Sequence, residues 1–311
     1  MTELCIFDGH CDTAVELWRR GLSLADSPLA ISLKKARGFR SYVQVFAFCV
    51  AWMPQELRDG DAFARSLAYF SGQLDNCRDE IRLLRTVGEL EAVLTGGGRG
   101  AMLSIEGAEA ISCDPGRLED AYEAGIRMIS LTWNHSNALA GSCQTGEGLT
   151  AQGREFFRRA QKLGMLVDVS HVSDRAFWEM CELAEKPIVA SHSNARALCG
   201  HPRNLTDDQF RALCDLGGTA GINLFRAFLS DGPATVEDVC RHIDRFCELG
   251  GPEHVALGGD LDGCDELPAG IASVADYEKI AAALEARGYG REALQEIFGG
   301  ALLRTASRCF R

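Results

Sequence analysis

The chain has 311 residues, 46% of them hydrophobic, and a formal net charge of −12 at pH 7. Such a length can bury a large core, and the acidic balance leaves no basic stripe to bind nucleic acid or an anionic membrane. With neither a secretory leader nor an apolar run of the ~20 residues that cross a bilayer, we expect no membrane insertion or secretion. The 13 cysteines form no regular framework, which favours free thiols in a cytoplasmic protein.

Short apolar runs alternate along the chain with longer amphipathic segments. We predict eight strands, at residues 4–7, 42–50, 101–105, 127–131, 165–169, 187–190, 219–224 and 255–258. Helices are predicted at residues 62–85, 153–163, 174–184, 206–216 and 235–249, with closing helices at 274–286 and 291–307. Eight such units favour a (β/α)8 TIM barrel, and an open doubly wound sheet is the alternative. No linker divides the chain, so we expect residues 1–311 to form one domain.

Metal-binding residue types gather at the ends of the predicted strands. His10 and Asp12 follow the first strand, and residues two apart in extended backbone point to the same side. Four other strand ends carry Glu106, His171, His192 and Asp260. Since barrel enzymes place their active sites at the carboxyl ends of the strands, we expect these side chains to face one another.

Three imidazoles and three carboxylates exceed the ligands that one tetrahedral zinc ion needs. They suit two ions that share a bridging carboxylate. Many barrel hydrolases of the amidohydrolase type bridge their two metal ions with a carbamylated lysine, but no lysine of this chain lies at the carboxyl end of a predicted strand. Glu106 is therefore the natural bridge. Imidazole favours zinc, but carboxylates also suit Mn²⁺ or Co²⁺, so the metal stays open.

Five short motifs occur in a fixed order along the chain. They are DGHCD at 8–12, SIEG at 104–107, DVSHVS at 168–173, SHS at 191–193 with RNL at 203–205, and GGDLDG at 258–263. In this order they resemble the membrane (renal) dipeptidase family of zinc peptidases, within the amidohydrolase-like superfamily. The resemblance runs from residue 4 to about residue 270 and implies a (β/α)8 barrel with two zinc ions at its C-terminal face.

The resemblance also implies a role for each ligand. One zinc ion would be bound by His10 and Asp12, the other by His171 and His192, with Glu106 bridging both. A hydroxide held between the ions would attack the scissile carbonyl of a dipeptide. Family members also tolerate a D-residue in the second position, so L,D-dipeptides are candidate substrates.

Two further residues would handle the substrate. The resemblance implies that the guanidinium of Arg203 holds the terminal carboxylate, for which its planar fork is suited. Asp260 would contact the substrate and act as the acid/base for the water and the leaving amine. Asp260 and the bridging Glu106 are therefore the predicted catalytic residues.

One motif departs from the family. The mammalian members have Leu-Thr-His after the fourth strand, where the histidine steadies the oxyanion, but this chain has Trp133 in that position. Asn134 or His135 could take over this contact with the substrate, or the metal could supply it alone. We assign no chemistry to His201, His242 or His254, which lie away from the strand ends.

Two other functions stay open. A related binuclear amidohydrolase would act on N-acyl amino acids, cyclic imides or lactones, and Arg203 favours a free carboxylate without choosing among these. A non-catalytic metal-binding or peptide-binding relative would be expected to lack one of the ligands, and this chain has them all. Family relatives often dimerise, so the resemblance allows a homodimer without indicating its surface.

Overall fold

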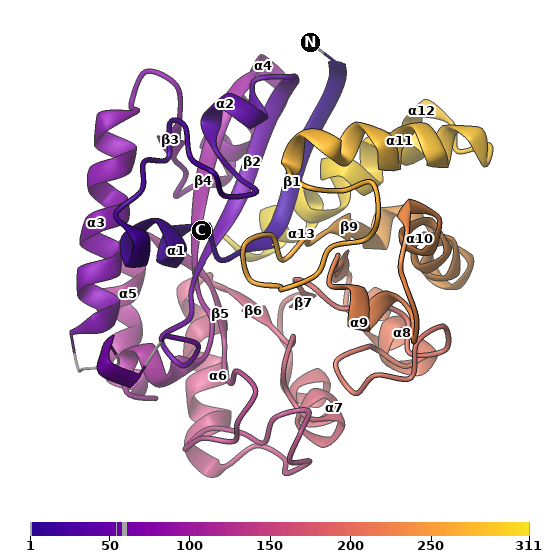
Figure 1. The fold of residues 1–311 in the computed structure, drawn as a ribbon. Coiled ribbons are helices and arrows are strands. Elements are labelled where there is room, and N and C mark those ends of the chain that lie inside the picture. Colours follow the sequence, from indigo (N-terminus) through magenta and orange to yellow (C-terminus); the bar gives the residue numbers. More distant parts are fainter. Residues whose placement is uncertain (1, 54, 58–60, 311) are drawn as a thin grey trace.

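Eight parallel strands close into a barrel that is surrounded by helices (Figure 1). The computed structural model describes residues 2–53, 55–57 and 61–310. The barrel strands are β1 Thr2–Cys11, β2 Phe39–Phe48, β4 Gly98–Ile105, β5 Ile126–Ser130, β6 Leu166–Asp168, β7 Val189–Ala190, β8 Thr219–Ile222 and β9 Val255–Leu257. They pair in this order, and β9 pairs with β1 to complete the circle. All eight predicted strands and the (β/α)8 barrel are thereby confirmed.

Helices connect the strands and cover the outside of the barrel. They are α1 Thr13–Arg20, α2 Leu33–Ala36, α3 Ala62–Asn76, α4 Val87–Gly96, α5 Leu118–Glu123, α6 Ala151–Leu163, α7 Asp174–Leu183, α8 Asp207–Asp215, α9 Arg226–Leu229, α10 Val236–Gly250, α11 Tyr277–Ala286, α12 Arg291–Gln295 and α13 Ala301–Cys309. Several of them begin at a side chain that caps the first turn; Thr150, Ser173 and Thr206, for example, each accept a backbone N–H of α6, α7 or α8. No helix within the described ranges has the length and apolar character needed to cross a membrane.

Two predicted helices differ from the structure. The helix predicted at 62–85 ends at Asn76, and Arg82–Leu83 forms the short strand β3 beside β4. Leu84 packs where Gly100 has no side chain, so a tertiary contact decides this segment. The helix predicted at 291–307 is divided by a π turn, Glu296–Gly300, where Gly299 lies against the backbone of β1.

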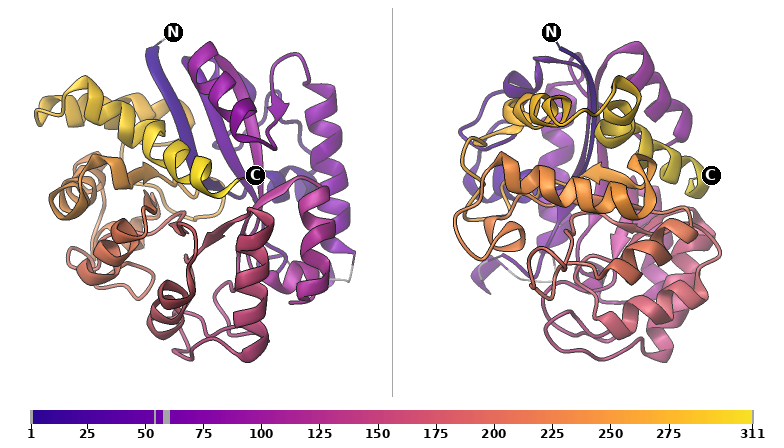
Figure 2. Two further views of the ribbon diagram at one scale, coloured as in Figure 1. Left: turned by 180° about the vertical axis from the view of Figure 1, so that it is seen from behind. Right: turned by 90° about the vertical axis from the view of Figure 1, so that its right-hand side faces the viewer.

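The barrel is filled at the end away from the carboxyl ends of its strands. Strand residues such as Phe7, Met102 and Leu166 share one buried apolar cluster with Val93 of α4 and Leu302 of α13. Figure 2 shows the yellow C-terminal helices beside the indigo strand β1. A larger cluster fills the space between the strands and the helices. The carboxyl ends of the strands are thus left free to carry polar side chains.

Candidate metal centre and substrate cavity

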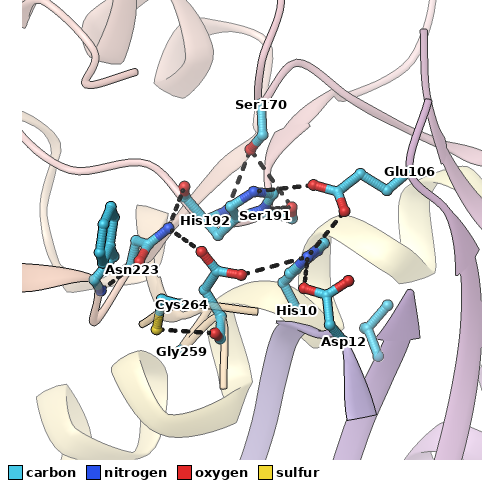
Figure 3. A network of polar contacts seen from close by, with 12 residues as sticks. His10, Asp12, Glu106, Ser170, Ser191, His192, Asn223, Gly259 and Cys264 are labelled. Carbon is cyan, nitrogen blue, oxygen red and sulfur yellow. Dashed lines mark hydrogen bonds and ion pairs between the residues drawn. The ribbon is translucent and has the colours of Figure 1, made fainter. Parts of the chain in front are cut away.

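Six of the predicted residues meet at the carboxyl ends of the barrel strands. Figure 3 labels His10, Asp12, Glu106 and His192 among them. They come from the ends of β1, β4, β6, β7 and β9 and are His10, Asp12, Glu106, His171, His192 and Asp260. All except Asp260 are at least nine-tenths buried. The fold therefore brings together residues that lie up to 250 positions apart in the sequence.

The carboxylate of Glu106 lies between two groups of ligands. Its Oε1 is 2.8 Å from Nε2 of His171 and 3.5 Å from Nε2 of His192, while its Oε2 is 3.6 Å from Nε2 of His10. Asp12 completes the second group, with Oδ2 3.6 Å from the same His10 nitrogen. Each group gathers its ligand atoms within 4.8 Å, and Glu106 belongs to both.

Several atoms of the cluster are buried without the partners that they need. Among the described residues, Nε2 of His10 and Oδ1 of Asp12 have no hydrogen-bond partner. The Nε2 atoms of His171 and His192 face each other at 3.0 Å. Leaving such groups unpaired in the interior is costly, and a cation in each group would pair them. The donor set therefore fits metal ions.

Neighbouring side chains fix the orientation of two imidazoles. Oδ1 of Asn134 lies 2.9 Å from Nδ1 of His171 and accepts its proton. Ser191 donates its hydroxyl proton to Asp168 at 2.5 Å, so His192 must donate Nδ1–H to Ser191 at 2.7 Å. Both histidines thus keep the Nε2 lone pair for a metal, as is usual for metal-bound histidines.

Asp168 also lies near His10 and His192 and could be taken for a ligand. Its Oδ1 accepts the backbone N–H groups of Ser170 and Ser191, each at 2.9 Å, and its Oδ2 accepts the Ser191 hydroxyl. Because both oxygens are engaged, Asp168 positions the loops that carry the histidines.

Asp8 in β1 likewise positions residues at the carboxyl ends of its own strand and of β9. It accepts the backbone N–H of His10 at 2.9 Å, that of Gly259 at 3.1 Å, and the hydroxyl of Tyr277. Neither Asp8 nor Asp168 was predicted to have a role in the site. The sequence contains a signal for both residues, because an aspartate within a buried strand needs hydrogen-bond donors beside it.

Charge is concentrated in the cluster. Burial disfavours the imidazolium of His10, but the carboxylates of Glu106, Asp12 and Asp260 raise its pKa to about 10. Burial and the charge of Glu106 raise the pKa of Asp12 to about 6. Crowded carboxylates of this kind repel one another, and divalent cations between them would reverse that repulsion.

Asp260 lies beside the cluster with one oxygen free to face it. Its Oδ2 accepts Nδ2–H of Asn223 at 2.9 Å, and its Oδ1 is 3.8 Å from Nε2 of His10. Burial raises the pKa of Asp260 to about 7, opposed by His10 and reinforced by Asp12 and Glu106. The nearby Asp262 instead accepts Thr13 and the backbone N–H of residue 30, so it holds loops together.

Arg203 lies at the edge of the centre. Its side chain is nearly buried, with Nη1 3.4 Å from the Ser193 hydroxyl and Nη2 3.3 Å from the His192 carbonyl. Its Nε has no hydrogen-bond partner among the described residues, so the guanidinium keeps donors for an anion. Nδ1 of His201, to which we assigned no chemistry, accepts the backbone N–H of Arg203 at 3.2 Å.

A cavity of about 160 Å³ opens over the metal centre and Arg203. Its wall adds four aromatic residues, Trp52, Trp133, Phe225 and Phe228, to the polar groups. Asn134 also lines it, whereas His135 is exposed and does not. Of the two predicted substitutes for the family's oxyanion histidine, the structure therefore brings only Asn134 to the cavity.

The family model described as membrane dipeptidase (peptidase family M19) matches residues 1–309. The chain belongs to this family. The resemblance expected from the motifs is thus confirmed, and this member of the membrane dipeptidase family is a metallo-dipeptidase.

Relatives support the same assignment. An uncharacterized protein of Klebsiella pneumoniae is 36% identical over 252 residues, which cover 76% of this chain and 92% of that protein. An uncharacterized dipeptidase of Schizosaccharomyces pombe is 33% identical over 66% of this chain, and the match spans 52% of its length. A solved metallo peptidase from Rhodobacter sphaeroides, liganded with a phosphinate mimic of L-Ala-D-Ala, is 26% identical with a TM-score of 0.89, and the match covers 99% of this chain and all of that one.

Proposed function

We propose that this metallo-dipeptidase uses two zinc ions to hydrolyse dipeptides that have a free terminal carboxylate. The position of Glu106 carries the proposal, because one carboxylate faces two separate groups of ligands. His10 and Asp12 would hold one ion, and His171 and His192 the other. The imidazoles favour zinc over Mn²⁺ or Co²⁺. When bound, the ions would lower the pKa of a water molecule and polarise the scissile carbonyl.

Arg203 would bind the substrate's carboxylate. Its guanidinium lines the cavity and has an unpaired Nε, so a planar carboxylate can accept two of its protons. This contact fixes the scissile bond over the centre, which reduces the entropy lost on reaching the transition state.

Asp260 would move the proton. As the C–O bond to the attacking water forms and the C–N bond of the amide breaks, Asp260 takes a proton from the water and gives it to the departing nitrogen. Asn223 holds one oxygen of this carboxylate, which leaves Oδ1 directed to the reacting atoms. The amide nitrogen of Asn134 is available for the substrate carbonyl, since its Oδ1 is engaged by His171.

The mimic bound by the Rhodobacter relative supports L,D-dipeptides as substrates beside L,L-dipeptides. The cysteines of the described residues are all free thiols, which supports a reducing, cytoplasmic location.

The test combines metal analysis with a panel of L,L- and L,D-dipeptides, N-acyl amino acids and lactones. We expect about two zinc ions per chain and turnover of dipeptides. Asp260→Asn should retain the zinc and lose activity by about 10²–10⁴-fold, whereas His192→Ala should lose zinc as well as activity. Activity that survives His192→Ala, or turnover of lactones alone, would contradict the proposal.

A further inference from the structure

The cavity contains one carboxylate that the proposed reaction does not use. Asp265 lies in the loop after β9, is exposed, and lines the cavity. It forms no ion pair with another of the described residues. The adjacent Glu266 does not line this cavity and is paired with Arg226. Of two consecutive acids, one is therefore neutralised within the protein and the other is left facing the substrate space.

The loop that carries Asp265 is fastened to the loop after β8. The backbone N–H of Arg226 donates to the carbonyl of Glu266 at 3.0 Å, in addition to the pairing of their side chains. Phe225 directly precedes Arg226, so Phe225 and Asp265 belong to adjoining parts of the cavity wall.

The same wall leads back to Arg203. The rings of Phe225 and Phe228 meet edge to face at 4.9 Å, and the guanidinium carbon of Arg203 is 5.5 Å from the Phe228 ring centre. From the ends of β7 to β9, the wall therefore runs from a buried cation through two aromatic rings to an exposed carboxylate.

This sequence of groups matches one class of substrate. A dipeptide whose carboxylate is held by Arg203 has the side chain of its C-terminal residue beside the two phenylalanines. Lysine and arginine carry a long apolar stem with a cation at its tip, so the stem can cover the rings while the tip reaches the acid. We propose that Asp265 selects dipeptides with a cationic C-terminal residue. This inference rests on the proposed dipeptidase function and names its substrate class.

The expected effect is moderate, because a solvated ion pair contributes little. The test measures kcat/KM for Ala-Lys, Ala-Leu and Ala-Glu, with the C-terminal residue in the configuration that the enzyme cleaves best in Ala-Leu. Asp265→Asn should lower the Ala-Lys to Ala-Leu ratio by about three- to fivefold. Asp265→Lys should lower it further and raise the ratio for Ala-Glu. Asp75→Asn, the control, removes an equal charge from an exposed position of α3 outside the cavity and should leave the ratios unchanged.

Two further substrates locate the contact. For Lys-Ala and Leu-Ala the ratio should stay the same in Asp265→Asn, since the N-terminal residue lies away from Arg203. The inference would be overturned if Asp265→Asn changed the Lys-Ala to Leu-Ala ratio and not the Ala-Lys to Ala-Leu ratio. It would also be overturned if both Asp265 variants left both ratios unchanged. Failure of the wild-type enzyme to cleave Ala-Leu would instead contradict the proposed function. Bound zinc in each variant, measured beforehand, verifies that the exposed substitution leaves the centre intact.

Discussion

His171 and Asp260 hold their side chains in place with backbone conformations that L-residues seldom adopt. Their φ angles are +73° and +54°, in the left-handed region that favours glycine. Such conformations cost of order 1–3 kcal/mol and persist only where the surroundings enforce them. Here His171 donates Nδ1–H to Asn134, Asp260 accepts from Asn223, and the backbone of both residues is hydrogen-bonded to neighbouring loops or strands. Both of these residues line the cavity, whereas Ser112, Cys113 and Asp262, which also have positive φ, do not.

His242 is buried in α10 and should make the stability depend on pH. Its Nδ1 accepts the backbone N–H of Ala195 and its Nε2 donates to the carbonyl of Leu229, each at 3.0 Å, so the ring is neutral. Burial, aided by Arg241 and opposed by Leu229 and Asp238, lowers the pKa of His242. As the pH falls through about 6.5, His242 therefore becomes protonated in the unfolded chain but stays neutral in the folded protein. The free energy of unfolding decreases as a result.

The check compares wild type with His242→Gln by thermal unfolding. Between pH 8 and pH 5.5, the advantage of the wild type over the variant should shrink by up to about 1.4 kcal/mol. Parallel stability profiles would show that His242 is protonated equally in both states.

The meeting of the six candidate site residues could be predicted from the sequence because they follow strand ends, and the barrel brings the carboxyl ends of its strands together. The groups that orient them could not, since Asn223 and Ser191 look like ordinary loop residues until Asp260 and Asp168 are beside them. For the same reason, the sequence does not decide whether Asn134 or His135 takes the place of the family's oxyanion histidine. The side chain of Asn134 lines the cavity, and only the loop's conformation separates it from His135.

Glycines in β1 and β8 and directly after β9 lie against the carbonyl oxygen of Ser191. A Cβ on Gly258 would lie 1.8 Å from the carbonyl oxygen of Ser191, one on Gly221 2.0 Å, and one on Gly9 2.9 Å. The loop that carries His192 is thus packed against bare backbone from β1, β8 and β9. The eight strands could be predicted from apolar runs, but these close approaches, like the end of α3, depend on partners distant in sequence.

Gly258→Ala should therefore damage both stability and the metal centre. The added methyl must displace the Ser191 carbonyl and with it His192, so we expect a loss of about 3 kcal/mol or more in the free energy of unfolding. Zinc affinity, measured by competition with a chelator, should fall as well. Gly72→Ala in α3, where a Cβ meets no atom within 4 Å, is the control and should be neutral or stabilising. Equal behaviour of the two variants would refute the packing argument.

The whole molecule should be stabilised by its metal ions. The unpaired atoms of His10 and Asp12 and the crowded carboxylates are costs of the metal-free fold, while the apolar clusters of the barrel lie elsewhere. Chelation should leave the circular dichroism unchanged and lower Tm. Free zinc at a hundred times Kd adds about 2.7 kcal/mol, or roughly 5 °C for a chain of this size.

Glu106→Gln provides the comparison. Because it removes the charge that both groups of ligands share, the gain in Tm on adding zinc should largely disappear. An unchanged gain would mean that the stabilising ion binds elsewhere.

The pairing of β1 with β9 sets when this enzyme can first become active during its synthesis. Asp8 in the first strand accepts a backbone N–H from Gly259, 251 positions later, and β1 pairs with the last strand at Leu257. At 5–20 residues per second, the ribosome needs roughly 12 to 50 s to make the intervening chain. During that interval His10 and Asp12 have left the ribosome without the strands that complete their site. A candidate metal centre that needs both β1 and the residues after β9 can therefore form only once the chain has been made beyond Gly259.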